Sequence, residues 1–427
     1  MKLAKQFAAI FLCILPALRS SAQSDNHAIP ILPPRDTCGN DSFCVKRNYK
    51  DELDFKDLAG DLWHDATGRK VAKRIDTGEV VNTKLRVSAV PAAGYSLATG
   101  LAALVAANAI FRTNVDANTS TMVTSFTYTV RNQIILPLIT SIWTGDNKYN
   151  IVTDWRYVKF PSYTYGLGGY TTISDGYLIN YSAIRLHSTL LRMIKPHMYA
   201  GIGYNMDYFY NIEELNPPAG KITDFERYEL SKIVNKTEFS SGITFNYLYD
   251  DRSNPLNPEK GNFVNVIYRT NVVSLGNNYS WRSLVIDARK YIPFPYNSEN
   301  VLAFWTYDWF TVTGQAPYLM MPNTGGDPYS NTGRGYILGR FRGNNMIYAE
   351  GEYRFGLTNN GLIGGVVFAN AESVTEQTSG RFETIAPGWG AGIRLKLDKF
   401  SRTNVALDYG FGLNGSGGLF VNIGEVF

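Results

Sequence analysis

The stretch that decides the fold is residues 345–355, which read NMIYAEGEYRF. One set of alternate side chains is apolar and comprises Ile347, Ala349, Tyr353 and Phe355. The other set is polar or charged and comprises Tyr348, Glu350, Glu352 and Arg354. Successive side chains of a β-strand point to opposite faces of the sheet, so the segment predicts a strand with one apolar and one charged face. Such a strand fits a soluble sandwich, or a membrane barrel with lipid outside and a wet interior.

The same alternation recurs along the chain after residue 85. It is clear at 239–249, 393–397 and 404–411, between clusters of Gly, Pro, Asn and Asp that are typical of turns. Strands marked by this rule start near residues 86, 98, 119, 131, 148, 177, 195, 237, 261, 279, 299, 343, 361, 386, 402 and 417. Bacterial single-chain barrels have an even number of strands. Taken together the segments favour the membrane. We predict an all-β fold, a transmembrane antiparallel β-barrel of about 16 strands over residues 85–427.

The lengths of the connections support this prediction. Long connections, around 160–176, 212–236, 314–342 and 374–385, all fall on one side of the predicted barrel. Short turns, around 250–260, 292–298, 357–360 and 398–401, fall on the other side. Outer-membrane barrels divide their long outer loops from their short periplasmic turns in the same way. One segment, Leu97 to Phe111, is rich in alanine and could be a helix by propensity; we assign it to the second strand.

The composition agrees with a barrel and excludes a bundle of membrane-spanning helices. Charged residues make up 18% of the 427 residues, and the chain has 28 Tyr and 23 Phe. The mean hydropathy is -0.17, and no uncharged apolar run reaches the roughly 18 residues that a spanning helix needs. A barrel strand places every second side chain in lipid and the others in a polar lumen, so its mean hydropathy stays near zero.

The N-terminal residues predict an exported protein. Lys2 and Lys5 precede the apolar stretch 7–18, and Ser20-Ser21-Ala22 follows it, which is the order of regions in a secretory signal peptide. We predict a signal peptide at residues 1–22; Cys13 lies in the middle of the apolar stretch, which makes a lipoprotein the weaker alternative. Removing this segment takes three of the 41 basic residues and none of the 37 acidic ones. The mature chain is therefore nearly neutral, and no nucleic-acid partner is implied.

Residues 23–84 are polar and form a separate N-terminal region. A proline-rich stretch is followed by residues 51–63, whose apolar spacing suggests a short amphipathic helix. We predict a periplasmic segment or plug here. Cys38 and Cys44 are an even pair in an exported chain, which favours a disulfide, with two free thiols as the alternative. The four His are scattered, so we predict neither a metal site nor a cofactor.

Three motifs carry a family resemblance. Arg334-Gly335-Tyr336 precedes residues 339–344 and the strand around Glu350, and this arrangement resembles the sixth-loop motif of the BamA/TamA superfamily, also called bacterial surface antigens. The segments 250–258 and 392–410 also resemble that family, and the match extends over about residues 85–427. The resemblance implies an outer-membrane channel of a Gram-negative bacterium that assists insertion or translocation of proteins. Relatives usually carry periplasmic βαββ modules, whereas residues 23–84 lack the strand-like runs of such a module.

The loop motif also makes a physical prediction. The loop that contains Arg334 is rich in glycine and could fold back into a wide lumen. An arginine buried there needs acceptors that offset its desolvation; an ordinary exposed loop arginine is the alternative. By the resemblance the partners of Arg334 lie on the inner wall, and the acidic candidates are Glu350, Glu352, Glu372 and Asp408. Relatives usually have Asp where this chain has Asn370, so we expect a neutral hydrogen bond or a different partner at that position.

The first and last strands predict a weak closing seam. Pro91 cannot donate a backbone hydrogen bond, Gly94 follows it, and the last hairpin is rich in glycine up to Gly424. The final residues alternate in polarity and end in Phe427, which resembles the terminal strand signal of outer-membrane proteins. A weak seam can open sideways, and an exposed strand edge accepts an incoming strand. Members of the family that this chain resembles are thought to insert their client proteins by such strand addition, so the resemblance implies the same route here. An ordinary closed barrel with a flexible rim is the alternative.

These features predict a channel of the BamA/TamA type that works through the seam between the first and last strands. The expected partners are outer-membrane lipids, possible client barrel proteins and accessory periplasmic proteins. A passive pore or surface binding barrel that keeps the fold without insertase activity is the alternative function. The sequence shows no Ser/His/Asp arrangement with a supporting motif, so we do not predict an enzyme.

Overall fold

The structure is a computed structural model. It describes residues 52–58, 60–61, 68, 85–115, 117–217, 220, 222–229, 236–277, 279–296, 298–399 and 402–427. The predicted signal peptide, the Cys38 and Cys44 pair and most of the predicted segment 23–84 lie outside the described residues. Those assignments and the domain boundaries therefore stay predictions.

Strands make up most of the described chain. They are β1 (Arg86–Ser96), β2 (Gly100–Phe111), β3 (Ser120–Thr129), β4 (Ile134–Trp143), β5 (Tyr149–Lys159), β6 (Ser162–Thr164), β7 (Tyr177–Lys195), β8 (Met198–Leu215), β9 (Glu238–Asp250), β10 (Gly261–Asn271), β11 (Trp281–Pro293), β12 (Val301–Thr313), β13 (Asn345–Gly356), β14 (Ile363–Val374), β15 (Ala386–Asp398), β16 (Thr403–Phe411) and β17 (Gly417–Ile423). The helical elements are short and comprise α3 (Asp224–Glu229), η2 (Ile173–Asp175), η3 (Val273–Leu275), η4 (Tyr318–Met320) and η5 (Leu413–Gly415). No helix in the described ranges is long and apolar enough to cross a membrane.

All strands belong to one antiparallel sheet of 17 strands. β5 and the three-residue β6 both pair with β7, because the chain interrupts one long strand at Phe160 and at Pro161, which has no N–H to donate. Counted with β6 as part of β5, about sixteen strands form the wall, and each predicted start lies within three residues of an observed one. The predicted strand count is confirmed. The alanine-rich segment 97–111 holds β2 and not a helix, since ladders to β1 and β3 outweigh its helical propensity.

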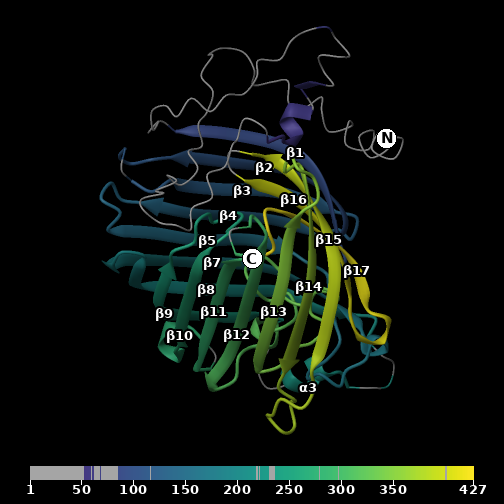
Figure 1. The fold of residues 1–427 in the computed structure, drawn as a ribbon. Helices are drawn as coiled ribbons and strands as arrows, with labels where there is room; N and C mark the ends of the chain where they lie inside the picture. The colour runs from purple at the N-terminus through teal and green to yellow at the C-terminus, as the bar shows by residue number, and fades with distance from the viewer. Residues whose placement is uncertain are drawn as a thin grey trace.

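The sheet curls into a barrel with an apolar outer face and a charged inner face. In Figure 1 the strands of the first half, purple to blue, run across those of the second half, green to yellow. Outward side chains such as Val367 and Ile393 are about half exposed, whereas inward Glu350, Glu352 and Asp408 are buried. Lipid on one face and a polar lumen on the other require this pattern, so the barrel spans a membrane.

The four long connections all lie at one end of the barrel, and every connection at the other end is shorter. The short ones include 196–197, 251–260, 294–300, 357–362 and 399–402. Four long ones, which we call the outer cap, are 165–176, 216–237, 314–344 and 375–385. Within the outer cap, Tyr228 Oη donates to the Ala316 carbonyl at 2.6 Å, and the Gly169 N–H donates to Glu376 at 2.7 Å. The long loops are therefore packed on one another across the outer end of the lumen.

Candidate functional site in the lumen and at the seam

Part of the connection between β12 and β13, residues 324–342, folds back into the lumen and is called the lumen loop here. Its Tyr336 and Phe341 are buried in an apolar cluster with Trp305 of the wall. At Gly335 the φ angle is +114°, and a Cβ there would overlap the carbonyl group of Phe411 in β16. Only glycine adopts this conformation readily. Gly335 therefore lets the loop backbone lie directly against the wall.

Arg334 is the central side chain of the site, and it is 1% exposed. Its Nη1 donates to Asp408 at 2.7 Å, its Nη2 donates to Glu352 at 2.6 Å, and the same Nη2 donates to Glu350. The guanidinium carbon lies 3.7 Å from the ring centroid of Phe368, which is a cation–π contact. One loop arginine thus joins β13, β14 and β16.

Further charged groups extend this cluster. The lumen ion cluster joins the side chains of Arg334, Arg354, Arg394, Glu350, Glu352, Asp408 and Glu425. Arg354 Nε binds Glu352 at 2.5 Å, and Arg394 Nη1 binds Asp408 at 2.5 Å. Burial opposes the charge of the Arg334 guanidinium, but the three carboxylates around it raise its pKa well above the ordinary value. Arg334 is therefore a cation, and the cluster is stable only as a set because buried charges must be paired.

The two residues after Arg334 bind the last strands. Tyr336 Oη donates to the Pro387 carbonyl at 2.6 Å and accepts the Leu413 N–H at 2.9 Å. Ser416 Oγ donates to the Gly335 carbonyl at 2.8 Å. These bonds hold the motif against β15 and against the turn between β16 and β17. The Arg334-Gly335-Tyr336 motif therefore connects β13 to the last hairpin.

Asn370 and Glu372 of β14 are placed differently from the carboxylates that bind Arg334. Asn370 Nδ2 donates to the Arg334 carbonyl oxygen at 2.9 Å, which is a neutral hydrogen bond to the loop backbone. Glu372 accepts a hydrogen bond from Thr324 Oγ1 at 3.0 Å and is not a partner of Arg334 in the described structure. Of the four acidic candidates, three therefore surround the guanidinium.

The sequence pattern does not single out Arg354, Arg394 and Glu425 as members of the cluster. A usable signal exists for Arg354, because a carboxylate and an arginine two residues apart on a strand face the same side. This spacing gives what we call the within-strand pairs, Asp154–Arg156 in β5, Asp287–Arg289 in β11 and Glu352–Arg354 in β13, with N–O distances of 2.5, 2.7 and 2.5 Å. Glu425 carries no such signal, because it reaches the cluster only through a turn after β17.

Residues 424–427 leave the barrel wall. The sequence predicts Phe427 in the last strand, but β17 ends at Ile423, and the chain turns inward at Gly424, where φ is +96°. Phe427 is 4% exposed, and its ring stacks on Trp305 at 5.1 Å between centroids. Its carbonyl accepts a hydrogen bond from Arg354 at 2.8 Å. The expected position of Phe427 at the seam is thus corrected, because aromatic and cationic partners hold it in the lumen.

The seam lies between β1 and β17. β1 pairs with β2 over residues 86–96, and β17 pairs with β16 over residues 417–423. The two strands are neighbours, yet no ladder joins them in the part of the chain that the structure describes. Pro91 and Gly94 both lie within β1. Leu97, in the turn after β1, packs over Gly418, where an added Cβ would overlap its side chain.

Residues 52–58, which include one helical turn at 55–58 and which we call the rim helix, contact short turns of the barrel. Lys56 Nζ binds Asp398 at 2.5 Å, and the Leu53 N–H donates to the Asn360 carbonyl at 3.0 Å. Figure 1 shows this helical turn, in purple, beside β1. These contacts tie the described part of the N-terminal region to the turn between β13 and β14 and to the end of β15.

Comparison with known proteins agrees with this architecture. The sequence matches the family model "Omp85 superfamily domain" over residues 110–414. The fold is similar to that of BamA from Haemophilus ducreyi lacking POTRA domains 1–3, with a TM-score of 0.53, 14% identity, and coverage of 80% of this chain and 69% of that chain. It is also similar to CdiB from Acinetobacter baumannii, with a TM-score of 0.51, 11% identity, and coverage of 81% of this chain and 61% of that chain. For CdiB from Escherichia coli the TM-score is 0.51 and the identity 9%, with coverage of 79% of this chain and 62% of that chain. The chain thus spans about three fifths of the CdiB chains. No curated protein sequence matches it. At these identities the structural likeness shows the shared fold.

Proposed function

Because the chain belongs to the Omp85 superfamily and lies in the outer membrane of a Gram-negative bacterium, we propose that it is a channel that assists insertion or translocation of proteins there. The observation that carries the proposal is the seam. Every other pair of neighbouring strands in the wall shares a ladder, whereas none joins β1 to β17 among the described residues. The proposed route for a client is sideways, between these two strands.

The physics of strand edges supports this route. An unpaired edge in lipid is costly, because its backbone N–H and C=O groups find no water to bind. An incoming β-strand satisfies these groups, so strand addition is favourable. β17 has 7 residues and β1 has 11, so even complete pairing of the two would leave part of the β1 edge open. We expect a client hairpin to begin pairing at this remaining edge.

The lumen loop supports the proposal by anchoring one side of the seam. Arg334 binds carboxylates of β13 and β16, and Tyr336 binds the turn that leads into β17. At the other end of β17, Asn331 Nδ2 donates to the Val426 carbonyl at 2.7 Å. The last strand is thus tied to the loop both before and after its span. We therefore expect β1, and not β17, to move when the seam opens.

The contents of the lumen argue against an open pore. The outer cap packs four loops together at the outer end, and the lumen loop and Phe427 occupy the interior. Free diffusion through the barrel would require these groups to move together. The proposed partners are client barrel proteins and accessory periplasmic proteins that bring clients to the seam. No enzymatic step belongs to the proposal.

A disulfide across the seam tests the proposed function. Leu97→Cys with Gly418→Cys joins two positions that already pack on each other. The matched control is Val367→Cys with Ala391→Cys, an opposite pair within the β14–β15 ladder on the lipid-facing side. Cells that depend on the oxidised seam variant should lose other barrel proteins from the outer membrane, measured by quantitative proteomics, and should regain them on reduction. The control pair should change nothing.

The opposite result would overturn the proposal. Unchanged levels and surface display of all other barrels and lipoproteins, with the seam variant fully oxidised, would exclude a role of the seam in insertion. If purified protein then also gave steady single-channel conductance in planar bilayers, the chain would be a passive pore.

A further inference from the structure

The lipid-facing side of β10–β14 carries a shallow groove of about 710 Å3. Its floor is a row of small or short side chains that stand opposite one another in successive ladders, namely Val264, Ala288, Thr306, Ala349 and Ala371. The large side chain of Phe304, which is 45% exposed, rises beside this floor. The difference in side-chain length creates the depression.

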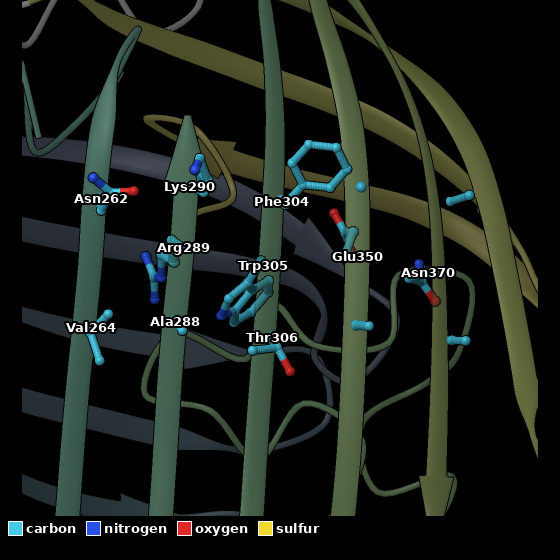
Figure 2. Close-up of a pocket in the computed structure, with 14 residues that line it drawn as sticks. Asn262, Val264, Ala288, Arg289, Lys290, Phe304, Trp305, Thr306, Glu350 and Asn370 are labelled. Atoms are coloured by element: carbon cyan, nitrogen blue, oxygen red, sulfur yellow. The ribbon is translucent and has the colours of Figure 1, made fainter. Parts of the chain in front are cut away.

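The neighbouring row, nearer the short-turn end of the barrel, closes the groove. Figure 2 shows Asn262, Lys290 and Phe304 at one level of β10, β11 and β12, with Val264 and Thr306 in the next row. The Phe304 ring lies beside Gly351, 3.6 Å from the position that a Cβ would take there. The groove thus has an apolar floor, an aromatic wall and an amine at one end.

Lys290 carries a charge for which the wall offers no partner. It is exposed, lies three residues before the end of β11 at Pro293, and has no carboxylate within ion-pair distance among the described residues. The nearby Asp251 carboxylate instead accepts hydrogen bonds from Tyr249 Oη at 2.8 Å and from the Asn262 backbone N–H. A charge on the lipid-facing side is tolerated only near the headgroups, so Lys290 lies at the level of lipid phosphates.

The opposite end of the groove is also polar but already satisfied. Asp308, one row beyond the floor, accepts hydrogen bonds from Thr306 Oγ1 at 3.0 Å and from the Tyr348 N–H at 3.4 Å. Its carboxylate is therefore engaged by the sheet itself. The surface between Asp308 and Lys290 is apolar, as the contact surface of an acyl chain must be.

We propose that this groove binds one anionic phospholipid, with an acyl chain along the floor and the phosphate at Lys290. The volume lies within the range of about 300–1,000 Å3 that is typical of small-molecule sites. The Lys290 amine supplies the positive charge that complements the phosphate, as basic residues do in headgroup-binding pockets between transmembrane helices. The site lies on the wall of β10–β14 and is separate from the seam.

Native mass spectrometry of the purified protein tests this proposal, with dioleoylphosphatidylglycerol and dioleoylphosphatidylcholine as probes. The wild-type protein should retain the anionic lipid about fivefold more strongly, the effect of one basic residue near a membrane surface. Lys290→Gln should abolish this preference. The matched control is Arg192→Gln, because Arg192 is exposed three residues before the end of β7 and lies outside the groove. That control should keep the preference.

Substitutions that fill the floor test the contribution of the groove to lipid binding separately from that of the Lys290 charge. Ala349→Leu should lower retention of both lipids, and Ala371→Leu is a second floor variant; heat-modifiable migration in gels reports whether each barrel has folded. Equal retention of the two lipids by wild type, an equal effect of Arg192→Gln, or unchanged retention in both floor variants would overturn the proposal. Dimers of the chain that vanish in Ala349→Leu would overturn it in favour of an interface between copies.

Discussion

Replacing Arg334 by methionine preserves most of the side-chain length but removes its charge from the lumen ion cluster. Two of the three carboxylates around it keep another cation, since Arg354 and Arg394 each hold one of them at 2.5 Å. Glu350 keeps only the hydrogen bond that the uncharged Tyr348 hydroxyl donates to it. The lumen ion cluster then has two arginines, in place of three, for four carboxylates, and Glu350 is the carboxylate that loses its only cation. Removing one partner of a buried pair costs about 3–5 kcal/mol, so we expect the free energy of unfolding to fall by that amount.

Guanidinium unfolding of the folded barrel in lipid vesicles, followed by tryptophan fluorescence, measures this change. Adding Glu350→Gln to Arg334→Met should recover most of the loss, because it removes the uncompensated charge. Adding Glu372→Gln should recover none, because Glu372 binds Thr324 and not Arg334. A cost below about 1 kcal/mol, which is the size of an exposed ion pair, would refute the reasoning. Equal rescue by the two second substitutions would refute it as well.

Three further predictions concern the backbone of the loop, the inward turn after β17 and the rim helix. Gly335→Ala should lower the free energy of unfolding by about 1–3 kcal/mol or more in the same titration. The control is Gly380→Ala, at φ +66° with open space around it, which should cost less. Equal costs would contradict the close approach of the loop to the wall at Gly335. Phe427→Ala should cost about 3–5 kcal/mol and shift Trp305 emission to longer wavelength, and unchanged emission would argue against the lumen position. Lys396→Gln with Lys399→Gln removes contacts to Glu52 at 2.9 Å and to Asp57 at 2.8 Å and should speed chymotrypsin cleavage at Phe55. Lys260→Gln, an exposed change in another short turn, is the control and should not affect that rate.

Strand positions could be predicted because lipid and lumen make opposite demands on successive side chains. The alternation in residues 345–355 places β13 almost to its ends, and the same rule places every other long strand. The break between β5 and β6 could not be predicted, because Pro161 is equally compatible with the end of a strand and with an interruption inside one. Only the common partner β7 shows that the two pieces form one strand.

The site could be predicted by residue type but not by geometry. Arg334 and its acidic candidates follow from the chemistry of a buried cation, yet Asn370 and Glu372 share one face of β14 and meet different parts of the loop. The position of the loop backbone decides between them, and no local pattern encodes that position. The predicted position of Phe427 is wrong for a related reason. Residues 419–423 alternate as a strand should, and nothing local distinguishes a turn at Gly424 from one more strand residue.

The within-strand pairs of β5, β11 and β13 have a consequence for how such a barrel is built. Each of these strands carries one carboxylate and one arginine two residues apart on the same face, so these two charges neutralise each other before any neighbour arrives. These pairs therefore need no oppositely charged neighbouring strand, and their charges give no preference for one neighbour over another. At these positions the choice of neighbour rests on hydrogen-bond alignment and side-chain fit, which act only after the strands are already in contact.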